Sequence, residues 1–173
     1  MKINFTRVLL FLIAIFVLSV FLFSLNKINI YDTKNLIGQN IKSFEIKSFK
    51  DEKIISEKNL KENKYTLINF WASWCAPCRA EHKYLIKLKN NTQNLKILGV
   101  NFKDKNKDAK KFIAEFGDPY HISGKDPDGR SSVNFGIYGI PESILVDQSL
   151  IIVGKFIGPL NFEDYKEILN LTK

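Results

Sequence analysis

The stretch that decides the fold reads YTLINFWASWCAPC and covers residues 65–78. Its first seven residues, Tyr65–Trp71, are mostly apolar and typical of a buried strand, whereas Arg79 to Leu88 carries apolar residues at helical spacing. The only two cysteines of the sequence, Cys75 and Cys78, therefore stand where a strand leads into a helix. This placement indicates that the chemistry of the protein depends on the pair.

The spacing of the pair suits thiol chemistry. If Cys75 occupies the N-cap or first turn of the helix, unpaired backbone N–H groups and the helix dipole favour its thiolate, which makes it the expected nucleophile. Cys78 lies on the same side of the helix, so its sulfur can reach Cys75 and act as the resolving thiol. Pro77 is tolerated in a first turn, because its missing N–H has no intrahelical partner there, and it stiffens the ring.

Two other interpretations of the pair stay open. A CxxC motif is also half of a zinc site, but a tetrahedral site needs two more ligands, and the only histidines are His82 and His121. A purely structural disulfide is the second interpretation, although so short a loop constrains an unfolded chain too little to stabilise a fold well. We therefore expect a redox-active disulfide and no bound metal.

The N-terminal segment is apolar enough to cross a membrane. Residues 8–25 contain no charge and span about 27 Å as a helix, close to the roughly 30 Å of a bilayer core. Lys2 and Arg7 also fit the start of a signal peptide, but no small-x-small cleavage site follows the apolar run. We expect an uncleaved transmembrane anchor at 8–25, with residues 1–7 in the cytoplasm.

The rest of the chain has the size of one domain. Residues 26–40 are polar and are expected to form a tether, and residues 41–173 are expected to fold on the far side of the membrane, where disulfides form. The net charge of +8 comes mainly from scattered lysines, with only three arginines in the sequence. A nucleic-acid partner would require a gathered basic face, so none is expected.

Periodicity and turn residues predict the remaining elements. They are a half-buried edge strand at Ser43–Phe49, a helical turn at 56–60, a buried strand at 95–102, a charged helix at 106–116, a loop at 124–129, a short helix at 130–135, hairpin strands at 143–146 and 150–156, and a last helix from the cap Asn161 to Leu171. A parallel crossover followed by a terminal hairpin requires a mixed sheet, covered by helices on both faces. The expected fold class is therefore α/β.

The residues around the cysteines and a later proline resemble a thioredoxin-like fold. The match covers residues 43–172 and rests on Trp74-Cys75-Ala76-Pro77-Cys78, on Gly139-Ile140-Pro141 and on the final hairpin with its helix. The resemblance implies that the Ile140–Pro141 bond is cis and that its loop lies beside the cysteines. The segment between Cys78 and Pro141 is longer than in small thioredoxins, which implies a central strand-helix insert at about 95–122.

Within that fold the chain is similar to the CcmG/DsbE family of cytochrome c maturation. The likeness rests on residues 78–85 (CRAEHKYL), 99–104 (GVNFKD), 117–120 (GDPY) and 136–142 (GIYGIPE). It implies a thiol:disulfide oxidoreductase without a cofactor, held in a bacterial inner membrane with its domain on the periplasmic side. The implied role is to reduce disulfides in apocytochrome c or in a haem-ligation partner, with re-reduction by a membrane electron donor of the DsbD or CcdA type.

The resemblance also suggests supporting residues. The buried aspartate usual in thioredoxins is replaced by Asn69, which cannot titrate. Proton transfer at Cys78 is then expected from Glu81, one turn later on the helix, and from Glu142, directly after Pro141. The alternative for Glu81 is a solvated carboxylate that only complements the helix dipole.

Neighbouring residues bear on shielding and on the direction of electron flow. Trp74 is expected to shield one side of the disulfide, with Phe70 and Trp71 packed beneath it. Ala76 and Pro77 supply no positive charge and two nearby carboxylates would oppose a thiolate, so we expect a thiol pKa nearer the roughly 7 of thioredoxin than the roughly 3.5 of DsbA, and hence a reductant.

Two further functions stay open at this point. One is a general extracytoplasmic thiol-disulfide reductase with broad substrates, and the other, from a different class, is a metal-binding chaperone. A peroxidase of the related peroxiredoxin group would need a threonine at position 72, where this chain has Ala72.

Overall fold

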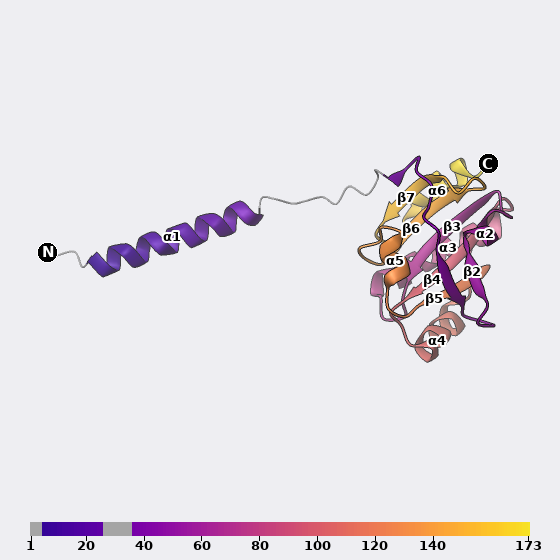
Figure 1. Cartoon of the computed structure of the whole chain (residues 1–173), viewed down its shortest axis with the longest axis horizontal. Helices are drawn as coiled ribbons and strands as arrows, with labels where there is room; N and C mark the ends of the chain where they lie inside the picture. The colour runs from indigo at the N-terminus through magenta and orange to yellow at the C-terminus, as the bar shows by residue number, and fades with distance from the viewer. Residues whose placement is uncertain (1–4, 26–35) are drawn as a thin grey trace. The chain divides into compact units, whose positions relative to one another are not determined.

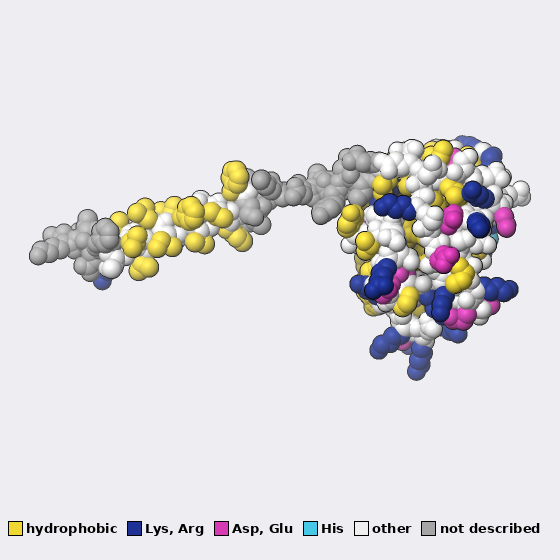
Figure 2. All heavy atoms as spheres, viewed as in Figure 1, with side chains coloured by type: hydrophobic (Ala, Val, Ile, Leu, Met, Phe, Trp, Pro, Cys, Tyr) yellow, Lys and Arg dark blue, Asp and Glu magenta, His cyan; other side chains and the backbone are white. Residues whose placement is uncertain are grey.

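The computed structural model describes residues 5–25 and 36–173, which belong to two separate units (Figure 1). The first unit holds helix α1 (Phe5–Leu25), which contains the expected membrane span at 8–25. Among the described residues this is the one helix long and apolar enough to cross a membrane, over Thr6–Phe23, a test that a signal sequence would also pass. Apolar side chains cover most of its visible surface (Figure 2).

The second unit is built on a seven-stranded mixed sheet with the order β2-β1-β5-β4-β3-β6-β7. Its strands are β1 (Glu45–Ser48), β2 (Ile54–Ser56), β3 (Tyr65–Trp71), β4 (Leu95–Phe102), β5 (Ile122–Asp126), β6 (Glu142–Asp147) and β7 (Ile152–Ile157). Its helices are α2 (Glu57–Leu60), α3 (Ala76–Asn91), α4 (Asn106–Phe116), α5 (Arg130–Asn134) and α6 (Phe162–Leu171). Strands β3, β4 and β5 run parallel, and the other neighbours pair antiparallel.

Each face of the sheet carries its own hydrophobic cluster, because side chains alternate along a strand. Leu67 and Trp71 of β3 pack with both cysteines against α3, α4 and α6, and we call this side the cysteine face. Ile68 and Phe70 point the other way, into a cluster with residues of α2 and the end of α5, and we call that side the opposite face. Helices therefore cover both faces, as predicted.

The structure corrects two of the predicted elements. The segment at 124–129 was expected to be a loop, but Gly124 to Asp126 belong to strand β5. Gly124 occurs in this strand because the side chain of Ile46 packs where a Cβ would stand, so the turn-like composition is misleading here. Strand β1 was expected at the edge of the sheet, but β2 pairs with its outer side and forms the edge. Strand β2 is only three residues long, too short to show a hydrophobic period in the sequence.

Two expected boundaries also move. The predicted insert ended at residue 122, whereas β5 extends that parallel part of the sheet to Asp126. The described part of the expected tether, residues 36–40, pairs with the domain: Gly38 N donates to Ile152 O at 2.8 Å, and Asn40 bridges Ile151. The remaining tether residues, 26–35, lie outside the described residues.

Candidate active site

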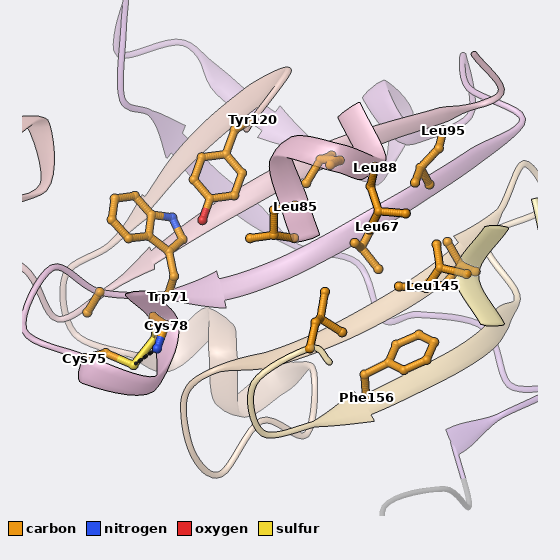
Figure 3. Packing of buried hydrophobic residues seen from close by; sticks show 14 of the residues in the cluster. Leu67, Trp71, Cys75, Cys78, Leu85, Leu88, Leu95, Tyr120, Leu145 and Phe156 are labelled. Carbon is orange, nitrogen blue, oxygen red and sulfur yellow. Dashed lines mark hydrogen bonds between the residues drawn. A yellow bond between two sulfur atoms is a disulfide. The ribbon is translucent and has the colours of Figure 1, made fainter. Parts of the chain in front are cut away.

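The two cysteines lie at the junction of β3 and α3, and they form a disulfide (Figure 3). Cys75 is the N-cap of α3, and its sulfur accepts a hydrogen bond of 3.2 Å from the backbone N–H of Cys78. Pro77 lies in the first turn of the helix. These observations confirm the predicted cap position and pairing. An N–H group aimed at the Cys75 sulfur, together with the helix dipole, is the arrangement that stabilises a thiolate.

The loop in front of the pair is held by the loop between β4 and α4. The carboxylate of Asp104 accepts hydrogen bonds from Ser73 N at 2.6 Å and from Ser73 Oγ at 2.8 Å. The indole Nε1 of Trp74 donates to Lys103 O at 3.2 Å, and the Trp74 side chain is largely exposed next to the pair. We had not predicted the role of Asp104, although it lies in the GVNFKD segment.

Glu81 is fully buried one turn after Cys78, on the same helix. Its Oε1 accepts a hydrogen bond of 2.8 Å from Asn69 Nδ2, and its Oε2 accepts one of 2.9 Å from Leu160 N. Burial raises the pKa of the Glu81 carboxyl to about 7, although both hydrogen bonds oppose this shift. The interpretation of Glu81 as a solvated carboxylate is therefore wrong.

Asn69 connects Glu81 to two residues that we did not predict from the sequence. The hydroxyl of Tyr120 donates to Asn69 Oδ1 at 2.9 Å, and Asn69 Nδ2 also donates to Ser143 Oγ at 3.0 Å. The ring of Tyr120 stacks on Trp71, with 5.4 Å between the ring centres (Figure 3). A buried network therefore runs from Tyr120, two residues before β5, through Asn69 to Glu81 of helix α3.

Glu142 lies apart from this network. In β6, the side chains of Ser143 and Leu145 lie on the cysteine face. Because side chains along a strand point to alternate faces, the side chain of Glu142 lies on the opposite face. There its Oε2 lies 3.4 Å from Lys155 Nζ. Phe70, opposite Glu142 in the β3–β6 ladder, packs in the cluster of that same face. The expectation that Phe70 packs beneath the disulfide is therefore wrong, whereas Trp71 does pack in the cluster of the cysteines.

Pro141 directly precedes the first residue of β6, at the edge of the sheet where the cysteine loop begins. The Ile140–Pro141 bond is cis, as the resemblance implied. Because Phe70 pairs with Glu142, Pro141 comes level with Trp71, directly before the loop that carries Cys75. A cleft of about 530 Å³ lies on this side of the domain, lined among others by Phe102, Lys103, Val133, Tyr138 and Ile140.

The two histidines take part in packing. His82 Nε2 lies 2.8 Å from Gly117 O, and its ring meets Phe112 edge-on. His121 Nδ1 accepts a hydrogen bond of 3.0 Å from Ile97 N. Burial lowers the pKa of both imidazoles. Within residues 5–25 and 36–173, no three His, Cys, Asp or Glu side chains gather where a metal ion could be held.

Comparison with known proteins agrees with this geometry. Residues 36–169 match the family described as Redoxin. The chain belongs to the Redoxin family. This redoxin is 45% identical over 102 residues to the thiol:disulfide interchange protein HelX of Rhodobacter capsulatus, and 40% identical over 108 residues to the thiol:disulfide interchange protein DsbE of Escherichia coli. The alignments cover 59% and 62% of this redoxin and 57% of each relative, so they span little more than half of those proteins.

Solved structures give the same fold. The thioredoxin domain of a thiol-disulfide oxidoreductase from Bacteroides vulgatus is 27% identical to this redoxin, with a TM-score of 0.69 over 79% of this chain and 98% of that one. A thiol:disulfide interchange protein from Bacteroides sp. is also 27% identical, with a TM-score of 0.67 over 79% and 90% of the two chains. The thioredoxin-like fold implied by the sequence is therefore confirmed.

Proposed function

We propose that this protein is a thiol:disulfide oxidoreductase that works as a reductant through Cys75 and Cys78. The observation that carries the proposal is the disulfide itself, with the Cys75 sulfur at the N-cap of α3 and a backbone N–H aimed at it. Cys75 thiolate attacks a partner disulfide, forms a mixed disulfide and releases one partner thiolate. Cys78 thiolate then attacks the Cys75 sulfur and releases the second, so two electrons pass to the partner.

Glu81 is the group best placed to take the proton of Cys78 in the second step. Cys78 is almost fully buried in the disulfide form, so solvent has little direct access to its sulfur, and Glu81 stands one turn away on the same helix face. A carboxyl with a pKa of about 7 exchanges protons at neutral pH, as a general base requires. Asn69 orients this carboxyl and does not itself titrate.

The proposed direction of electron flow rests on how weakly the thiolate is stabilised beyond the N-cap. The backbone N–H of Cys78 and the helix dipole favour the Cys75 thiolate, but no cationic side chain lies between the cysteines, and ionised Glu81 would oppose a thiolate nearby. A weakly stabilised thiolate makes the reduced form less favourable and the protein a better reductant.

The proposed substrate is a disulfide in apocytochrome c or in a haem-ligation partner, and the proposed electron donor is a membrane protein of the DsbD or CcdA type. The identity to proteins named HelX and DsbE supports the first proposal, together with the four CcmG/DsbE-like segments. The apolar helix α1 supports a single-pass anchor in the bacterial inner membrane, with the redoxin domain in the periplasm.

A trapping experiment in cells tests the proposal. In Cys78→Ser, the Cys75 mixed disulfide cannot be resolved and is expected to accumulate with the physiological partner, which mass spectrometry identifies. Cys75→Ser is the matched control and is expected to trap nothing. A broad set of trapped proteins would instead indicate a general reductase. Stoichiometric metal on protein purified under reducing conditions would indicate a metal-binding chaperone.

A further inference from the structure

The opposite face of the sheet holds a buried ion pair that the thiol chemistry does not use. Lys155 of β7 and Glu142 of β6 lie 3.4 Å apart, with side chains that are 0% and 6% exposed. Burying two charges costs solvation energy that their attraction offsets only when further hydrogen bonds satisfy both groups. The partners of these hydrogen bonds therefore indicate which part of the backbone the pair holds.

All the hydrogen bonds of the pair go to one backbone segment. Lys155 Nζ donates to Gly136 O at 2.9 Å, and Glu142 Oε1 accepts from Tyr138 N at 3.2 Å and from Gly139 N at 3.1 Å. Three backbone groups of residues 136–139 are thus held by two side chains from the adjacent strands. The segment leads directly into the Ile140–Pro141 bond.

The same segment forms one wall of the cleft beside the cysteine loop. Tyr138 and Ile140 line this cleft, and Tyr138 is 68% exposed. Lys103 also lines this cleft, and its carbonyl oxygen accepts a hydrogen bond from the Trp74 indole, which connects the cleft to the cysteine loop. A polypeptide whose disulfide reaches Cys75 would lie against this cleft, so the position of segment 136–139 affects how well such a partner docks.

We propose that Glu142 and Lys155 are positioning residues, which hold segment 136–140 in place as the wall against which a polypeptide substrate docks. This inference rests on the proposed function. It replaces the expectation that Glu142 exchanges a proton with Cys78, because the carboxylate points away from the cysteine face, its Oε1 is hydrogen-bonded to the segment, and its Oε2 lies 3.4 Å from Lys155 Nζ.

Kinetics with two substrates test this inference. The variants are Glu142→Gln and Lys155→Met, each of which leaves one buried charge unpaired, and their double variant, which removes both charges. Lys155→Arg is the conservative variant, and Glu81→Gln is the reference for a proton role. The substrates are a synthetic peptide with a Cys-x-x-Cys-His segment in disulfide form, and oxidised glutathione, which is too small to span the cleft.

For the two single variants we expect KM for the peptide to rise about 10-fold, as for a lost buried interaction worth about 1.4 kcal/mol. With oxidised glutathione we expect kcat/KM and its pH profile to stay within about 2-fold of wild type. Lys155→Arg keeps a cation and a donor and is expected to recover part of the peptide KM, whereas the double variant has no donor for Gly136 O and is expected to keep the KM raised. Glu81→Gln is expected to change the pH profile with both substrates.

Two results would overturn the inference. One is a shifted pH profile with oxidised glutathione in Glu142→Gln, which would restore the proton role. The other is an unchanged peptide KM in both single variants. If a single variant does not fold, the double variant decides, because an unchanged peptide KM in that variant would also contradict the inference. Failure of the wild type to reduce either substrate would instead refute the proposed function.

Discussion

The Tyr120 hydroxyl lies 2.9 Å from Oδ1 of Asn69 and donates a hydrogen bond to it in the core of the domain. This bond fixes which end of the Asn69 amide faces Glu81, because only the Nδ2 end can donate to a carboxylate. The GDPY segment, at the end of α4, therefore helps to set the chemistry of a carboxyl on α3 that lies far from it in the sequence.

Tyr120→Phe is expected to lower the free energy of unfolding by about 1–2 kcal/mol, because it leaves the buried Asn69 oxygen without its donor. Chemical denaturation of the purified domain measures this loss. Tyr165→Phe is the control, because the Tyr165 hydroxyl only accepts an exposed hydrogen bond from Asn91, and it is expected to change stability by less than about 0.5 kcal/mol. Equal effects of the two substitutions would contradict the network.

Glu81→Gln is expected to change how stability depends on pH. In the folded protein the pKa of Glu81 is raised from 4.5 to about 7, so the wild type loses stability as the pH rises from about 4.5 through 7, by roughly 3 kcal/mol from this group. The amide does not titrate, so the difference in unfolding free energy between variant and wild type should move in favour of the variant over this window.

Denaturation curves at pH 4, 5.5, 7 and 8 on the oxidised proteins measure that difference. A constant offset at every pH is expected from the imperfect fit of an amide beside Leu160 N, and it carries no information on titration. A difference that is flat from pH 4 to 8 would show that the carboxyl keeps its ordinary pKa in the fold.

Asp104→Ala is expected to loosen the loop that carries Cys75. It removes the acceptor of Ser73 N and Ser73 Oγ, so kcat/KM for a peptide disulfide should fall on the order of 10- to 100-fold through misplacement of the nucleophile. The fluorescence of Trp74 should change as well. Glu163→Ala is the control, because that carboxylate makes an exposed contact to Lys166 and lies outside the cleft, and it should leave both readouts unchanged.

The elements with strong patterns could be predicted from the sequence. Strand β3, strand β4 and helix α4 appear at the expected residues, because each combines a clear hydrophobic period with distinct end signals. Strands β2 and β5 were missed. Strand β2 is too short to show a hydrophobic period. Strand β5 contains Gly124, which is required there because Ile46, distant in the sequence, packs against it.

The reacting pair was predictable, but its surroundings were less so. The i, i+3 spacing of Cys75 and Cys78 at a helix start is a local property, and the structure reproduces it. The burial of Glu81 depends on Leu160 and Asn69, which only the folded sheet brings together. The face on which Glu142 lies depends on the register between β3 and β6, which periodicity does not supply.

Equilibration of the purified domain with thiol redox buffers of known potential, read out by alkylation and mass spectrometry, tests the central claim most directly. We predict that Cys75 and Cys78 interconvert reversibly as one two-electron couple, with a potential nearer the roughly −270 mV of thioredoxin than the roughly −120 mV of DsbA. A pair that stays inert toward these buffers, or a potential near that of DsbA, would contradict a reductant built on these two cysteines.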